Sequence, residues 1–142
     1  MSPWHPVTSD AFSHLPWAVT RAEFLKTARD TGGDGACLVF VISEETPPGA
    51  RAGYAQLIIA YARANEPVTI DRDGISALLI TEGGVKAGAT VAERVFGLMR
   101  RISLETTIRA GVAALDGDPE TAIVTARRRA ELAGPSSTVL EG

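Results

Sequence analysis

The stretch from Arg63 to Thr81 constrains the fold more than any other part of the chain. Residues 68–71 and 75–81 are two short runs rich in apolar and β-branched residues, and the three residues between them, Arg72-Asp73-Gly74, are typical of a tight turn. The residues just before these runs end a helical pattern. The stretch therefore predicts a helix that leads directly into an antiparallel pair of strands.

Two elements are predicted near the N-terminus. Thr20-Arg21-Ala22-Glu23 is a capping box, in which the threonine and glutamate side chains each satisfy an unpaired backbone N–H. A helix should run from there to about Arg29 and stop at Gly32-Gly33. Residues 36–43 form a continuous apolar run, which is typical of a strand covered on both faces.

A second helix is predicted between this strand and the hairpin. Thr46-Pro47-Pro48 is a cap with proline in the first turn, and the helix should reach about Ala64. Its inward-facing residues would be Leu57, Ile58 and Tyr61.

Three further elements are predicted after the hairpin. Thr90-Val91-Ala92-Glu93 is a second capping box, so a helix should start there. Its inner stripe would be Val91, Val95, Leu98 and Ile102. Residues 106–114 read as a strand, and a last helix capped at Asp118-Pro119-Glu120 should end at Gly134. Residues 137–140 would add an edge strand.

The order of these elements predicts an α+β fold with a ferredoxin-like βαββαβ core, whose helices pack on one face of the sheet. The first helix would be an N-terminal helical lead-in to this core. With 142 residues the chain has room for one domain. We expect residues 1–9 to be a flexible N-terminal segment and residues 10–142 to form the domain.

Composition narrows the classes of function. The net charge of −3 disfavours nucleic-acid binding. Cys37 is the only cysteine, so the chain has no internal disulfide, and its apolar surroundings favour a buried, inert thiol. No apolar run is long enough to span a membrane, and the N-terminus does not resemble a signal peptide. We therefore expect a cytoplasmic protein without membrane insertion.

The hairpin and its flanks resemble the signature of the GGDEF (diguanylate cyclase) family. In that family R-x-x-D ends a helix, five residues follow, and G-G-[DE]-E-F precedes an apolar strand. Here Arg63-Ala64-Asn65-Glu66 is followed by five residues and then by Arg72, Asp73, Gly74, Ile75 and Ser76. The spacing is kept, whereas the signature letters are degenerate.

Other motifs resemble the family in the same order, over about residues 10–140. Asp10 to Pro16 is similar to D-x-L-T-G-L-P, and Gly49 to Leu57 is similar to G-H-x-x-G-D-x-x-L. Residues 107–113 resemble T-V-S-I-G-V-A, and residues 122–133 resemble the final helix, L-L-x-x-A-D-x-A-L-Y-x-A-K. The resemblance implies the palm-like fold of nucleotidyl cyclases and a role in bacterial signalling.

The departures from the family pattern bear on catalysis. The family holds magnesium against the GTP phosphates through an aspartate at the end of the first strand and an acid in the hairpin. Here these positions are near Ser43 and at Gly74. The guanine-reading aspartate is replaced by Tyr54, and the phosphate-contacting lysine falls at about Gly134. We therefore expect no cyclase activity, no catalytic residues, no metal site and no cofactor.

The same resemblance implies a ligand. In active cyclases R-x-x-D is the inhibitory site for cyclic di-GMP, and a further arginine comes from the next helix. Arg63, Glu66 and Arg94 occupy these positions, so a cyclic di-GMP receptor is one hypothesis. Because this ligand has two guanines, it could crosslink two copies into a homodimer. The alternative is that Arg63 and Glu66 form an ordinary surface ion pair.

A second hypothesis is a nucleotide-independent module for protein interaction or dimerisation, in which a signalling protein is the partner. Trp4 and Trp17 lie in a proline-containing segment and would be its aromatic anchors. The alternative, which we favour, is that the two tryptophans pack back over the helices. Direct measurement of ligand binding separates the two hypotheses.

Overall fold

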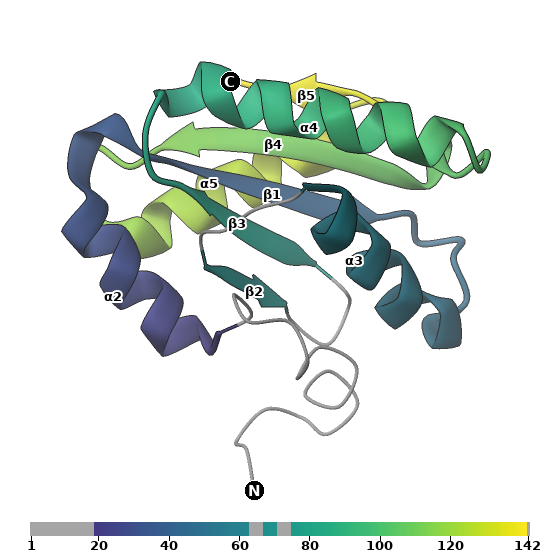
Figure 1. Cartoon of the computed structure of the whole chain (residues 1–142), viewed down its shortest axis with the longest axis horizontal. Coiled ribbons are helices and arrows are strands. Elements are labelled where there is room, and N and C mark those ends of the chain that lie inside the picture. The colour runs from purple at the N-terminus through teal and green to yellow at the C-terminus, as the bar shows by residue number, and fades with distance from the viewer. Residues whose placement is uncertain (1–18, 63–66, 71–74, 142) are drawn as a thin grey trace, which may run out of the picture.

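A five-stranded sheet lies between two pairs of helices (Figure 1). The computed structural model describes residues 19–62, 67–70 and 75–141. The strands are β1 (Ala36–Ile42), β2 (Val68–Ile70), β3 (Ser76–Ile80), β4 (Ile108–Ala114) and β5 (Thr138–Val139). The helices are α2 (Arg21–Thr31), α3 (Pro48–Ala62), α4 (Gly84–Arg100) and α5 (Pro119–Leu132). The predicted α+β class is confirmed.

The strand order is β2-β3-β1-β4-β5, with β1 in the centre. It pairs antiparallel with both β3 and β4, whereas β5 lies parallel to β4 at the edge. The predicted hairpin pairs β2 with β3, and Ile70 lies opposite Ser76. Read along the chain, β1-α3-β2-β3-α4-β4 is the predicted ferredoxin-like core, and β5 is the predicted edge strand.

The alternation of side chains in β1 explains why both faces of the sheet are covered. All seven of its residues are buried and apolar. Leu38 and Phe40 point to the face that carries α3 and α4, whereas Cys37 and Val39 point to the opposite face. A central strand that is apolar on both sides needs helices on both sides.

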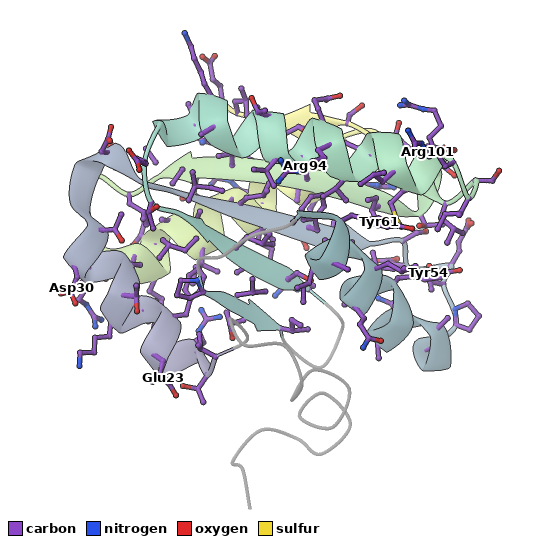
Figure 2. The ribbon with its side chains drawn as sticks, in the orientation of Figure 1. Glu23, Asp30, Tyr54, Tyr61, Arg94 and Arg101 are labelled. Atoms are coloured by element: carbon purple, nitrogen blue, oxygen red, sulfur yellow. The ribbon has the colours of Figure 1, made fainter. Side chains whose placement is uncertain are left out.

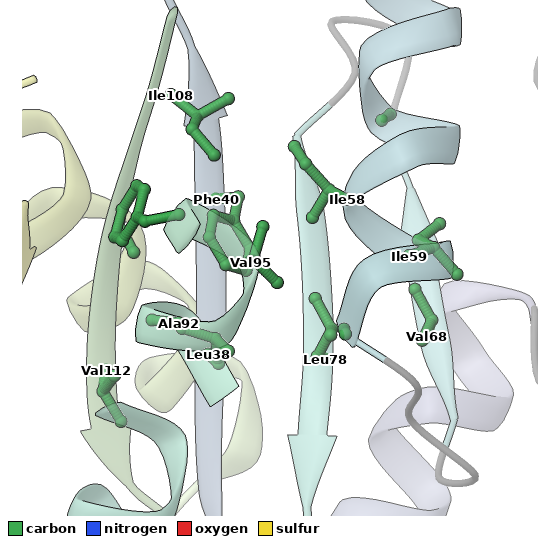
Figure 3. Packing of buried hydrophobic residues seen from close by; sticks show 14 of the residues in the cluster. Leu38, Phe40, Ile58, Ile59, Val68, Leu78, Ala92, Val95, Ile108 and Val112 are labelled. Carbon is green, nitrogen blue, oxygen red and sulfur yellow. The ribbon is translucent and has the colours of Figure 1, made fainter. Parts of the chain in front are cut away.

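The larger core lies between the sheet and helices α3 and α4 (Figure 3). Phe40 of β1 meets Phe96 of α4 edge to face, with ring centroids 6.0 Å apart. Of the residues predicted to face inward from α3, Ile58 is fully buried, while Leu57 and Tyr61 are partly buried at the margin of this core.

The smaller core lies between the other face of the sheet and helices α2 and α5. Phe24 and Ala28 of α2 and Ala126 and Ala130 of α5 pack there on β1, β3 and β4. The predicted packing of the core helices on one face of the sheet is therefore found for α3 and α4. The helical lead-in, α2, and the last helix, α5, cover the other face. The lead-in is also tied to the sheet edge, because the Val19 N–H donates to the Val68 carbonyl at 2.9 Å.

Of the two predicted capping boxes, the first is confirmed in its N-cap threonine and the second is wrong. The hydroxyl of Thr20 accepts a hydrogen bond from the Glu23 N–H at 3.2 Å, so α2 starts where the sequence indicates. Thr90, however, lies inside α4, and its hydroxyl donates to the Lys86 carbonyl. The helix begins at Gly84, because Gly83 takes the left-handed conformation (φ 94°) that turns the chain into it.

Smaller differences concern ends of elements. Ile102 was predicted to face inward, but it lies beyond the end of α4 and is 43% exposed. A short 3-10 turn, Glu105–Thr107, precedes β4, so that strand starts two residues later than predicted. The last helix ends at Leu132 rather than at Gly134. Its N-cap is Asp118 as predicted, and that carboxylate accepts from the Thr121 hydroxyl at 3.3 Å.

Candidate functional site

Arg94 is the predicted ligand-binding residue that the structure places most informatively. It is exposed on α4, on the side of that helix that faces α3 (Figure 2). Its guanidinium donates from Nε to the Tyr61 carbonyl at 3.4 Å and from Nη2 to the Ala62 carbonyl. These carbonyls end α3 and have no partners within the helix, so a cation there completes the hydrogen bonding and favours the helix dipole.

This contact lies at the last described residues before the R-x-x-E segment. Arg63 follows Ala62 directly in the chain, so Arg94 lies beside the point at which that segment begins. Arg63 and Glu66 themselves lie outside the described residues, as do Arg72, Asp73 and Gly74 of the segment matched to the family signature. Ile75 and Ser76 are described: Ile75 packs against the smaller core, and Ser76 starts β3 and is buried.

The positions at which a cyclase would hold metal and guanine can also be examined. Ser43 follows β1, and its hydroxyl accepts from the Glu45 N–H at 3.3 Å. Tyr54 is partly buried against the larger core. Among the residues that the structure describes, no three His, Cys, Asp or Glu side chains gather in a way that could hold a metal ion.

A cleft of about 770 Å³ opens at the carboxyl end of β1. The β1–α3 loop, the first turn of α3, the start of β4 and the second half of α5 contribute to its walls. It is lined by Val41, Ile42, Ser43, Glu44, Glu45, Pro48, Arg51, Ile75, Arg109, Arg127 and Glu131. Three arginines and three glutamates from distant parts of the chain therefore meet around one hollow.

The charged side chains of this cleft differ in their surroundings. Glu44, Glu45 and Glu131 are exposed, whereas Arg51 and Arg109 are partly buried. Arg51 donates to the Ser43 carbonyl at 3.3 Å. Arg127 forms an ion pair with Glu131 one helical turn away, with 3.7 Å between Nε and Oε2. The least exposed charges of the cleft are thus the two cations Arg51 and Arg109.

The prediction from sequence missed this group of arginines. Arg51, Arg109 and Arg127 are separated by 58 and 18 positions, counted from their residue numbers, and no motif joins them. One signal was present, because Arg109 is the only charged residue in an otherwise apolar strand. Alternation along β4 places Arg109 on the face covered by α5, where burial of a charged side chain without a partner costs free energy.

Cys37 is excluded from the candidate sites. Its side chain is fully buried in the smaller core, and burial raises the pKa of its thiol from 9.0 to about 12, while the positive charge of Arg21 lowers that pKa in part. A thiol that stays protonated is a poor nucleophile. The predicted buried and inert cysteine is confirmed by this position.

Comparison with solved structures identifies the fold. The GGDEF domain of FimX from Pseudomonas aeruginosa superposes with a TM-score of 0.68, at 16% identity over 99% of this chain and 100% of that one. The chain has the fold of a GGDEF domain. A shortened PA1120 (TpbB or YfiN) from the same organism, comprising only the GGDEF domain, matches with a TM-score of 0.58, at 16% identity over 87% and 90% of the two chains. No family model and no curated protein matches.

Within this GGDEF fold, the predicted features fall at two separate places. Ile75 and Ser76, which end the segment matched to the family signature, lie at the start of β3, and Ile75 also lines the cleft at the carboxyl end of β1. The R-x-x-E segment follows α3, whose opposite end lines the cleft. In the described part of the chain, no helix has the length and apolar character needed to cross a membrane.

Proposed function

We propose that this chain is a catalytically inactive GGDEF-fold signalling domain that binds cyclic di-GMP at the C-terminal end of α3. The observation that carries the proposal is the contact of the Arg94 guanidinium with the last carbonyls of α3. It brings a cation from α4 to the start of the segment that holds Arg63 and Glu66. The family resemblance implies an inhibitory-type nucleotide site in which an arginine from the next helix joins these two residues.

The three side chains have matching chemistry for this ligand. An arginine can bind a phosphate or the acceptor edge of guanine through two parallel hydrogen bonds. Glu66 can accept from the guanine amino group. Arg94 uses Nε and one Nη2 hydrogen on α3, so other guanidinium N–H groups stay available, and its side chain is exposed.

The proposal of inactivity rests on the residues at the catalytic positions. Ser43 stands near the end of β1, where the family has a metal-binding aspartate, and Gly74 takes the position of the hairpin acid. Tyr54 replaces the guanine-reading aspartate and packs against the core instead. Without these carboxylates the charge of a triphosphate is not neutralised for phosphoryl transfer.

Calorimetric titration of cyclic di-GMP into the full chain tests the receptor proposal. We expect micromolar or tighter binding that Arg63→Ala abolishes and Arg94→Ala weakens. Arg101→Ala is the matched control, because Arg101 is exposed just beyond the end of α4 and should leave affinity unchanged. Circular dichroism checks that each variant is folded. Absence of binding heat at high protein concentration would refute the receptor proposal.

Incubation with GTP and Mg²⁺, followed by chromatography of the nucleotides, tests the proposal of inactivity. We expect GTP to be recovered unchanged. Formation of cyclic di-GMP that depends on the chain would contradict this part of the proposal and leave the receptor part to be judged on binding alone.

A nucleotide-independent interaction module is the second candidate function. One observation favours it: Val124 and Leu132 of α5 are apolar yet 59% and 68% exposed. Exposed apolar side chains that lie two helical turns apart can contribute to a protein contact. If no nucleotide binds, a partner should be sought with these two positions changed to glutamine as the control.

A further inference from the structure

Ser103, in the connector between α4 and β4, has a backbone conformation that serine rarely adopts. Its φ of 60° lies in the left-handed region. The Leu104 N–H donates to the Met99 carbonyl at 2.9 Å. The Ser103 N–H donates to the Arg100 carbonyl at 3.1 Å. These two bonds are the Schellman motif, which ends many helices and usually has glycine at the left-handed position. A serine there is less stable than a glycine would be.

The packing of its neighbours holds Ser103 in this conformation. Met99 is fully buried in the larger core, and Leu104 packs against that core from the other side of the turn. Such an apolar contact commonly accompanies the motif. The Ser103 side chain is exposed, and within the part of the chain that the structure describes it makes no hydrogen bond. The fold therefore gives no reason for a hydroxyl at this position.

The residues just before Ser103 present two positive charges to solvent. Arg100 and Arg101 precede it by three and two positions, and both are exposed, as is Ile102. Arg101 lies at the C-terminal end of α4 (Figure 2). No other serine or threonine in the sequence follows a pair of arginines within three residues. Among the described residues, neither of the two arginines forms an ion pair.

The acidic residue of the connector does not cancel these charges at the surface. Glu105 is partly buried, and its Oε2 is shielded from solvent. The exposed turn thus combines a free hydroxyl, a strained backbone and two cations at fixed spacing. Backbone strain that the surrounding structure maintains is a mark of functional positions.

We propose that Ser103 is a phosphorylation site for a serine kinase whose acidic substrate groove recognises Arg100 and Arg101. Kinases select substrates partly by charge pattern, and guanidinium groups bind carboxylates through two parallel hydrogen bonds. ATP is the phosphoryl donor. The Ser103 Oγ forms a bond to the γ-phosphorus, and the bond from that phosphorus to the β–γ bridging oxygen breaks. ADP leaves, and the hydroxyl proton passes to the catalytic aspartate of the kinase.

The phosphate would loosen the end of α4. It carries a charge of about −1.5 to −2 and would lie at the negative end of the helix dipole, where an anion is unfavourable. Arg100 and Arg101 offset this only in part, because exposed ion pairs contribute little to stability. Opening of the turn also relieves the strained conformation at Ser103. The two bonds of the Schellman motif should therefore weaken.

This site is separate from the other two candidate sites. The cleft at the carboxyl end of β1 is lined by neither Ser103 nor the two arginines before it. Arg94 precedes Arg101 by about two helical turns. The proposal does not rest on the receptor function, so either can fail without the other.

Incubation of the full chain with ATP and the catalytic subunit of cyclic-AMP-dependent protein kinase tests the proposal. This kinase serves as a probe that prefers arginines before the acceptor serine. Peptide mass spectrometry should find one phosphate, on Ser103. Arg100→Gln and Arg101→Gln should each lower the initial rate by about tenfold. Arg29→Gln is the matched control, because Arg29 is exposed at the end of α2 and should leave the rate unchanged.

Ser103→Gly separates loss of the acceptor from loss of the fold. Glycine suits the left-handed conformation, so this variant should take up no phosphate and should melt at a higher temperature than the parent chain. In the phosphorylated parent chain, hydrogen exchange of the Ser103 and Leu104 amides should speed up by about tenfold or more. The amide of Ala92, inside α4, is the internal control.

Four results would overturn the proposal. The first is a folded chain that takes up no phosphate. The second is phosphate on another residue, such as Ser136, which also has a positive φ (54°) but no pair of arginines before it. The third is an equal rate for Arg101→Gln and Arg29→Gln. The fourth is unchanged hydrogen exchange after phosphorylation of Ser103, which would refute the loosening of the turn.

Discussion

At Gly111 the sheet and α5 approach each other so closely that a side chain has no room. A Cβ added there would collide with the backbone of α5 at Ala126 and Ala130. Backbone atoms cannot move aside as the tip of a flexible side chain can. The residue therefore sets the distance between β4 and α5, and with it the position of Arg127 over the cleft.

We predict that Gly111→Ala lowers the free energy of unfolding by about 3 kcal/mol, because it overpacks a rigid contact. Gly97→Ala is the matched control. An added Cβ at Gly97 of α4 meets nothing within 4 Å, so this change should raise stability by about 0.5–1 kcal/mol. Urea denaturation of the three proteins measures both effects. Equal stabilities of Gly111→Ala and the parent chain would contradict the close packing of α5.

The Cys37 thiol gives a prediction about pH. Its pKa is raised to about 12 in the folded chain by burial, although Arg21 lowers it in part, and the ordinary value is 9.0. Between these pH values the unfolded thiol is ionised while the folded thiol keeps its proton. The buried, protonated thiol therefore makes its full contribution to the free energy of unfolding below pH 9. Above pH 9 the free energy of unfolding falls, with a slope that approaches about 1.4 kcal/mol per pH unit.

Urea denaturation at pH 8, 9 and 10 should therefore show a steeper loss of stability in the parent chain than in Cys37→Ala. The comparison removes the contributions of lysines and tyrosines, which both proteins share. Identical pH slopes in the two proteins would show that the thiol is not held in a buried environment.

At the scale of elements, the two threonine-containing boxes provide a direct test of how helices start. Thr20→Ala removes the cap of α2 and should cost about 1 kcal/mol. Thr90 lies exposed inside α4, so Thr90→Ala should raise stability by about 0.5 kcal/mol through helix propensity. Thermal melts monitored at 222 nm would measure both. A loss of stability in Thr90→Ala would restore the helix start that the sequence pattern predicted.

The elements also show how much of the fold is readable from the sequence. Apolar runs, turn residues and caps act over a few residues, and they predicted β1, the hairpin, α2 and the ferredoxin-like order. The start of α4 was not readable, because Thr90-x-x-Glu93 fits a capping box as well as it fits a helix interior. The choice between them depends on the left-handed conformation at Gly83.

At the scale of the whole molecule, the two candidate sites differ in how far the sequence revealed them. Arg94 was proposed because, in the family that the sequence resembles, a further arginine comes from the helix after R-x-x-D. In the structure Arg94 lies beside the end of α3. Arg51, Arg109 and Arg127 come together only through the pairing of β1 with β4 and the packing of α5 on β4. No local pattern contains that information, so the cleft could not be predicted.

The proposed ligand also makes a prediction about the size of the particle in solution. Cyclic di-GMP has two guanines, so it can join two copies of the chain around a two-fold axis. Light scattering coupled to size-exclusion chromatography should show a doubling of the mean mass when the ligand is added. Arg63→Ala should remain at its ligand-free mass. A mass that does not change despite measurable binding would show that one copy binds the ligand alone.

The most direct test of the receptor proposal is a titration of the ¹⁵N-labelled chain with cyclic di-GMP, followed by amide chemical shifts. We predict that the shifts concentrate at the last turn of α3 near Ala62 and around Arg94 on α4, while amides of the β1 cleft such as Arg109 stay unchanged. Shifts confined to the cleft would place the nucleotide at the wrong end of α3. A spectrum that does not change at saturating ligand would contradict the receptor function itself.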